Sequence, residues 1–131
     1  MKLKFWIIAI IIVILDQITK ILLQNKHFGI INYATSTGAA FSLFSNSTTI
    51  LTIISFFMIG AIIYFYKKHS NAAIPLALLL GGTIGNFIDR VNFGYVRDFI
   101  DLKFWPIFNI ADSANVMGAI ILIYLIWKDK L

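Results

Sequence analysis

The sequence predicts an all-α membrane protein in which four transmembrane helices are capped at one end by a small β-sheet. Hydrophobic residues make up 60% of the 131-residue chain, and its mean hydropathy is +0.87, whereas soluble domains contain about 45–50% apolar residues. Four stretches approach the roughly 20 apolar residues that are needed to cross a bilayer. Two of the connections between these stretches are rich in residues that favour strands.

The expected spans fill the chain, so residues 1–131 are expected to form a single domain, with spans at 5–23, 48–66, 72–87 and 107–127. The first begins with two lysines, as a secretory signal does, but it lacks a small-residue cleavage site and is expected to be retained. In the third, the spacing of Gly81 and Gly85 allows a neighbouring helix to approach closely. Pro106 suits the first turn of the fourth helix, where its missing N–H is not needed.

The small sheet is expected from the two connections on the side away from the termini. The first connection, 25–47, contains the string FGIINY at 28–33, which favours a strand over a helix. The second, 91–101, begins with Asn-Phe-Gly, which reads as a turn at 92–94, and then alternates apolar and polar residues. Together these segments predict a sheet over one mouth of the bundle.

The basic residues indicate how the chain is oriented. With four spans, both termini and the connection at 67–70 lie on one side, together with Lys2, Lys4, Lys67, Lys68, Lys128 and Lys130. Five basic residues lie opposite, but most of them are close to an aspartate. The clustered lysines therefore place the termini in the cytoplasm and the sheet outside. Because the net charge of +5 is scattered over the membrane edges, we expect membrane lipids and not nucleic acid as its partners.

Metal and thiol chemistry have little support in the sequence. The chain has no cysteine, which excludes a disulfide framework, and its two histidines have no partner spacing. Asp98, Asn109 and Asp112 could offer oxygen ligands to Mg²⁺ or Ca²⁺, but the set is too small and two arginines would oppose a dication. We therefore expect neither a metal nor a cofactor.

Asp98 and Asp112 are the main candidates for catalysis. They stand fourteen positions apart in a chain with only six acidic residues. A charged side chain beside an apolar span is energetically costly, so one that occurs there is a candidate for function. If the sheet places Asp98 over the start of the fourth helix, the two carboxyl groups share a proton. Such a pair can act as base and acid on one water, as in aspartyl proteases. The alternative is two separate interfacial acids, each hydrated or paired with Arg97 or Lys103.

Further polar residues lie near the same ends of the spans. Asp16 and Lys20 are spaced to pair on one helix face, either in support of a site or only as an anchor of the span. Asn86, Asp89 and Arg90 share one face of the third span. On their own these three indicate helix packing and an interfacial salt bridge. Their closeness in sequence to the candidate acids favours a part in the site.

Five strings of the chain, taken in order, resemble the motifs of lipoprotein signal peptidase, the bacterial signal peptidase II. They are DQITK at 16–20, TGAAFS at 37–42, GGTIGNFIDR at 81–90, VRDFID at 96–101 and FNIADS at 108–113. The resemblance implies four transmembrane helices with a small extracytoplasmic β-cradle in the bacterial cytoplasmic (inner) membrane. It also implies an aspartyl endopeptidase that removes the signal peptide from diacylglyceryl-modified prolipoproteins just before the lipidated cysteine.

The resemblance also implies roles for single residues. Asp98 and Asp112 match the catalytic pair, and the positions that match the supporting polar and small residues are Asp16, Lys20, Asn86, Arg90, Asn109, Gly38, Ala39, Ala40, Gly81 and Gly82. Ser36 stands where the family usually has asparagine, so a contact to substrate backbone is expected to be weaker there. The short stretch before Gly38 implies a trimmed cradle.

Two rival functions remain open from the residues. In a Ser–Lys protease, Ser36 would be the nucleophile and Lys20 its base. In a small proton-coupled transporter, the acids would carry protons across the membrane. The position of the acids at helix mouths favours the peptidase, which we expect to act as a monomer.

Overall fold

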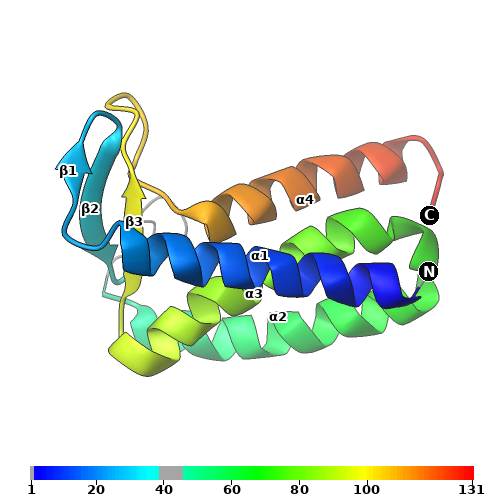
Figure 1. Ribbon diagram of the computed structural model, residues 1–131. Helices are drawn as coiled ribbons and strands as arrows, with labels where there is room; N and C mark the ends of the chain where they lie inside the picture. Colours follow the sequence, from blue (N-terminus) through cyan, green and yellow to red (C-terminus); the bar gives the residue numbers. More distant parts are fainter. Residues whose placement is uncertain (1, 39–45) are drawn as a thin grey trace.

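The computed structural model describes residues 2–38 and 46–131. In this part of the chain, four long helices lie side by side and a three-stranded sheet stands at one end of them (Figure 1). The helices are α1 (Lys2–Leu22), α2 (Thr48–Lys68), α3 (Ala73–Phe93) and α4 (Ile110–Trp127), with a 3₁₀ turn, η2 (Ser70–Ala72), between α2 and α3. The strands are β1 (His27–Phe28), β2 (Ile31–Ser36) and β3 (Val96–Ile100). Both termini lie at the end away from the sheet (Figure 1). The predicted fold class is confirmed.

The four helices are long and apolar enough to cross a membrane. Helix α3 is the centre of the bundle, since it packs against α1, α2 and α4 and is the most buried of the four. Large apolar side chains on the other three helices point outward and are exposed, among them Ile10, Phe57 and Ile123. Such surfaces suit lipid tails rather than water.

Helix α3 is longer than the expected span. It continues to Phe93 and ends at Gly94, whose φ of 75° gives a left-handed C-cap. The helix thus runs beyond the apolar span expected at 72–87, and the turn predicted at 92–94 was wrong for residues 92 and 93, which are helical. The helix outlasts its apolar run because Asn86 and Asp89 are buried and hydrogen-bonded within the bundle.

Helix α4 begins later than expected. Its first residue is Ile110, and Asn109 is its N-cap, so the predicted start at 107 was wrong and Pro106 lies in the preceding loop. The Asn109 side chain accepts from the Asp112 N–H, while the Asp112 carboxylate accepts from the Asn109 N–H. This capping box defines the start of the helix.

Close contact between α1 and α3 depends on the predicted glycines. A Cβ on Gly81 would lie 2.6 Å from Cβ of Ile12, and one on Gly85 would lie 2.6 Å from Oδ2 of Asp16. Any larger residue at either position would force the helices apart. At the end away from the sheet the interior is apolar, with the Phe5 and Tyr66 rings stacked 3.8 Å apart.

The sheet carries the chain back to the start of α4. Strand β2 pairs antiparallel with β1 and β3, and Asp98 lies opposite Ala34 in the β2–β3 register. Ile100 and Phe108 form a further bridge, in which the Ile100 N–H donates to the Phe108 carbonyl at 2.9 Å. This bridge holds the N-terminus of α4 beside β3.

Candidate active site

Asn109 connects the two candidate catalytic acids, one from β3 and one from the first turn of α4. Its Nδ2 donates to Oδ1 of Asp98 at 2.8 Å, and its backbone N–H donates to Oδ2 of Asp112 at 3.1 Å. Both carboxyl groups are almost fully buried. The structure therefore brings Asp98 and Asp112 into one small polar cluster.

The second oxygen of Asp112 is held by α3. Nδ2 of Asn86 donates to Oδ1 of Asp112 at 2.9 Å, so the two oxygens of this carboxyl group have separate donors. Oδ1 of Asn86 in turn accepts from Nδ2 of Asn109 at 3.0 Å. These contacts fix the orientation of the carboxyl plane.

Asp98 holds its proton more tightly than an ordinary aspartate. Burial, together with the charge of Asp112, raises the pKa of Asp98 to about 8. In the described part of the chain, no lysine or arginine forms an ion pair with either acid. At neutral pH the pair therefore retains a proton.

The expectation of two separate, cation-paired acids does not hold. Arg97 pairs with Asp89 at 2.9 Å, and Lys103 pairs with Asp101 at 3.3 Å. Strand alternation explains the difference, because Arg97 and Asp98 are neighbours whose side chains leave opposite faces of β3. Nor do the side-chain oxygens of Asp98, Asn109 and Asp112 all point to one metal position, since Oδ1 of Asn109 accepts from the Asp112 N–H in the helix cap.

A second cluster of buried charges lies behind the acids. Lys20 Nζ lies 2.7 Å from Asp16 and 3.3 Å from Asp89, and Asp89 also accepts from Arg97. Two acids thus balance two bases. The predicted pairing of Asp16 with Lys20 is confirmed, and Asp16 also accepts from the Ala111 N–H at 2.9 Å, which joins α1 to the start of α4.

Lys20 joins this charged cluster to the candidate acids. Its ammonium group donates to Oδ1 of Asn86 at 3.1 Å, and Nδ2 of the same amide donates to Asp112. Because an ammonium group has no acceptor, its contact fixes which end of the Asn86 amide faces Asp112.

Arg90, Gly38 and Ser36 lie at the edge of the site. The guanidinium group of Arg90 donates to the Gly38 carbonyl and to Oγ of Ser55, each at 3.3 Å. Oγ of Ser36 accepts from the Gly38 N–H at 3.2 Å. Within the described residues no hydrogen bond joins Ser36 to Lys20, so the Ser–Lys arrangement has no geometric support. The predicted small residues Ala39 and Ala40 lie outside the described residues.

Gln17 was not among the predicted site residues. The Gln17 amide donates to Asp89 at 3.1 Å and accepts from Arg97 at 3.0 Å, so it closes the charged cluster. A signal was available, because an amide beside Asp16 in an otherwise apolar span needs polar partners. Its partners come from α3 and β3, and no spacing within one helix reveals them.

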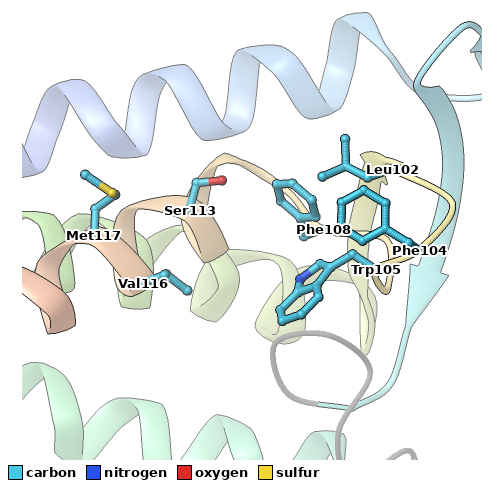
Figure 2. Close-up of a pocket in the computed structure, with 7 residues that line it drawn as sticks. All are labelled: Leu102, Phe104, Trp105, Phe108, Ser113, Val116 and Met117. Atoms are coloured by element: carbon cyan, nitrogen blue, oxygen red, sulfur yellow. The ribbon is translucent and has the colours of Figure 1, made fainter.

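An apolar cavity of about 330 Å³ flanks the start of α4. Figure 2 shows the side chains that line it, which come from α4 and from the loop before it: Leu102, Phe104, Trp105, Phe108, Ser113, Val116 and Met117. Ser113 directly follows Asp112. The cavity therefore borders the first turn of α4, the turn that carries Asp112.

Comparison with known proteins identifies the family. Residues 8–128 match the family model described as Signal peptidase (SPase) II. The chain belongs to the signal peptidase II family. The peptidase is 42% identical to a lipoprotein signal peptidase of Caldanaerobacter subterraneus subsp. tengcongensis, over 91% of this chain and 92% of the relative. It is 35% identical to one of Halothermothrix orenii, over 95% of this chain and 96% of the relative.

A solved structure, described as a bacterial membrane enzyme obtained by the in meso method at 2.3 Å resolution, is also similar to the peptidase. The TM-score is 0.85 at 35% identity, with 94% of this chain and 87% of the other covered. The predicted family is confirmed. The protein is thus a membrane protease of the aspartic class in the signal peptidase II family, and the relatives named above are lipoprotein signal peptidases.

Proposed function

We propose that the peptidase cleaves diacylglyceryl-modified prolipoproteins just before the lipidated cysteine, with Asp98 and Asp112 activating the attacking water. The observation that carries this proposal is the shared contact of both carboxyl groups with Asn109. It holds two buried acids together without a cation partner in the described residues. A pair of this kind keeps one proton and so offers a base and an acid at once.

The chemistry requires one ionised and one protonated carboxyl group. The ionised group takes a proton from water, whose oxygen attacks the scissile carbonyl, while the protonated group donates to the carbonyl oxygen. Collapse of the tetrahedral intermediate returns a proton to the leaving amine. The pair titrates as a unit, so the two roles belong to the pair and not to a fixed residue.

The surrounding polar residues are proposed to position the pair. Asn86 and Asn109 orient the carboxyl groups directly, whereas Lys20 and Asp16 act through Asn86 and through the start of α4. Arg90 donates to the Gly38 carbonyl and is proposed to bind substrate backbone. Ser36 and Gly38 form the adjoining turn.

The cavity in Figure 2 supports a lipid-bearing substrate. It is apolar, it borders the first turn of α4, which carries Asp112, and part of its lining belongs to this helix, which is suited to the membrane. Each methylene of an acyl chain that leaves water is worth about 0.8 kcal/mol. We propose that the substrate's acyl chains rest here and on the adjacent lipid-facing surface, with membrane lipids around a monomeric peptidase.

The proposed orientation follows from the same arrangement. The candidate acids lie at the sheet end, and the termini lie at the other end with their lysines (Figure 1). Both termini are proposed to be cytoplasmic and the active site extracytoplasmic. The transporter alternative is less well supported, because the four buried acids, at 16, 89, 98 and 112, gather at the sheet end, whereas the core at the other end is apolar.

Substitution of the two acids tests the proposal. Asp98→Asn and Asp112→Asn should each reduce cleavage of a lipidated prolipoprotein to the no-enzyme rate, because each removes half of the proton-sharing pair at nearly constant shape. Cleavage is measured by gel shift with purified protein in lipid micelles. Asp101→Asn is the matched control, since Asp101 bonds to Asn32 and Lys103 instead. Measurable turnover by either dyad variant would exclude the assignment.

A further inference from the structure

A small cavity on the other side of Asn86 is lined in part by Asn115, which has no role in the chemistry described so far. It measures about 170 Å³ and opens between α2, α3 and α4, where it is lined by Leu51, Ile54, Ser55, Met58, Thr83, Asn86, Arg90 and Asn115. Asn86 also donates to Asp112. Asn86 therefore lies between this cavity and Asp112, and the cavity lies within the membrane-spanning part of the bundle.

Two buried polar atoms on its walls lack a partner within the described residues. They are Nε of Arg90, which is a donor, and Oδ1 of Asn115, which is an acceptor. A buried polar atom without a hydrogen bond generally lowers the equilibrium constant for folding several-fold or more. The effect is larger where no water is available. A donor and an acceptor in one cavity complement a peptide group, which has one of each.

The position of Asn115 is set by a glycine on α3. A Cβ on Gly82 would contact Oδ1 of Asn115 and would lie 2.5 Å from the Ala111 carbonyl. The missing side chain at Gly82 thus leaves room for the Asn115 amide between the two helices. The amide lies three residues beyond Asp112 along α4, which corresponds to about 4.5 Å deeper into the bundle.

A signal peptide needs partners at this depth. Its scissile bond must be unwound to reach the acids, so the residues just before it lose their helical hydrogen bonds at membrane depth. An extended chain advances about 3.3 Å per residue, so 4.5 Å corresponds to one or two residues. The apolar part of a signal peptide precedes the cleavage site, so the deeper residues are those on its N-terminal side.

We propose that Asn115 is a substrate-positioning residue whose Oδ1 accepts a backbone N–H of the signal peptide one or two residues before the scissile bond. Arg90 Nε donates to a carbonyl of the same unwound segment. This proposal rests on the proposed function, and it adds a main-chain subsite that lies deeper than the acids. The contact forms on binding and persists in the transition state, so its loss should raise KM and leave kcat nearly unchanged.

An ester scan tests the contact directly. In a lipidated prolipoprotein peptide, single backbone amides at the three positions before the scissile bond are replaced by esters, which removes one N–H at a time. For the unchanged enzyme, kcat/KM should fall roughly threefold to tenfold at one of these positions, as expected for one lost hydrogen bond. Asn115→Leu, which has a similar volume and no acceptor, should show the same loss on the amide substrate and no further loss on that ester.

Two controls separate the contact from other effects. Ile120→Leu, on the exposed side of the same helix, should respond to the esters as the unchanged enzyme does. Asn115→Ala removes the acceptor without filling the space, and it should also abolish the ester effect. It replaces Asn115→Leu in the test if thermal unfolding shows that the leucine variant folds poorly. If every ester reduces kcat/KM equally in the unchanged and both Asn115 variants, Asn115 holds only water or structure, and the subsite is excluded. Failure of the unchanged enzyme to cleave the amide substrate would instead exclude the proposed function.

Discussion

At the residue scale, Asn109 combines two functions that can be separated experimentally. Its Oδ1 caps α4, while its Nδ2 donates to Asp98, to Asn86 and to the Arg97 carbonyl. Serine is as good an N-cap residue as asparagine but has no amide donor. The cap and the organisation of the candidate acids therefore respond differently to substitution.

Asn109→Ser keeps the helix cap but removes the buried amide donor, so it should lower the free energy of unfolding less than Asn109→Ala does, while it lowers cleavage strongly, on the order of tenfold or more. Asn109→Ala should lose both functions, with a further loss of about 1 kcal/mol in the free energy of unfolding. Thermal unfolding in detergent and the gel-shift assay measure the two effects. Equal activities of the serine variant and the unchanged enzyme would show that the amide does not organise the acids.

The proton of Asp98 predicts a pH dependence of both cleavage and stability. Because its pKa is raised to about 8, cleavage should decline as the pH rises past about 8, when the pair loses its last proton, and it should also decline in acid when both groups are protonated. The unfolded carboxyl group has a pKa of 3.8. Between these values only the folded protein holds the proton, so the free energy of unfolding should decrease as the pH rises.

Asp98→Asn provides the matched measurement. It removes the titrating group, so the decrease in stability between pH 4 and pH 8 should be smaller in the variant than in the unchanged protein. Thermal unfolding across this range measures the difference. Parallel pH profiles of the two proteins would contradict the raised pKa of Asp98.

Sequence reasoning predicted the important residue types but not all of their partners. Asp98 and Asp112 were identified because charged residues are costly beside an apolar span, whereas Asn109 was expected from the family resemblance. The partner of Arg97 was not, because its backbone N–H and its guanidinium group both donate to Asp89, eight residues earlier. That contact depends on how α3 ends and how β3 returns, which local spacing does not specify.

At the element scale, the charged cluster fixes α1, α3 and β3 relative to one another. Asp16 and Lys20 lie on α1, Asp89 on α3 and Arg97 on β3, and the carboxylates and the ammonium group have no exposed surface. Removing one charge from such a cluster leaves an uncompensated buried charge, which generally costs about 3–5 kcal/mol. The cluster is therefore expected to be more important for the arrangement of the elements than for their individual stability.

Lys20→Met should lower the unfolding temperature markedly, because Asp16 then lacks its cation and Asp89 retains only Arg97. The double variant Asp16→Asn with Lys20→Met should recover part of this loss, since the charges are balanced again. Thermal unfolding of both proteins in the same detergent is the measurement. An unchanged unfolding temperature for Lys20→Met would show that the ion pair does not contribute to stability.

The existence of the elements was predictable, but their ends were not. Four apolar runs were sufficient to predict four spans. Helix α3 extends beyond the apolar run at 72–87 because Asn86 and Asp89 are hydrogen-bonded inside the bundle. Pro106 was expected in the first turn of α4, but the helix begins only at Ile110. Its first turn is determined by the capping box at 109 and 112.

At the scale of the whole molecule, the bundle is divided into an apolar end and a polar end. Phe5, Tyr66 and Leu76 belong to the apolar end, while the acids and their partners lie under the sheet. Outward-facing apolar side chains cover most of α1, α2 and α4. A substrate with its own acyl chains can approach these surfaces from the bilayer.

Removal of the diacylglyceryl group should therefore reduce kcat/KM far more than a substitution distant from the cleavage site. Each methylene contributes about 0.8 kcal/mol to membrane anchoring, so a loss of several orders of magnitude is expected. Lipidated and unlipidated forms of one substrate are compared in the same micelles. Phe104→Ala, which changes the cavity of Figure 2, should lower kcat/KM for the lipidated substrate and leave kcat/KM for the unlipidated one unchanged. Equal rates for the two forms would contradict the lipid requirement.

The pairing of β3 also has a consequence for insertions and deletions in related sequences. Side chains of a strand alternate between its faces, so a shift of one residue at Gly94 or Tyr95 would turn Asp98 away from Asn109 and put a neighbour in its place. The segment at 101–107 is different, since the bridge between Ile100 and Phe108 closes it at its base. Natural length variation should therefore accumulate at 101–107 and be absent at 94–95.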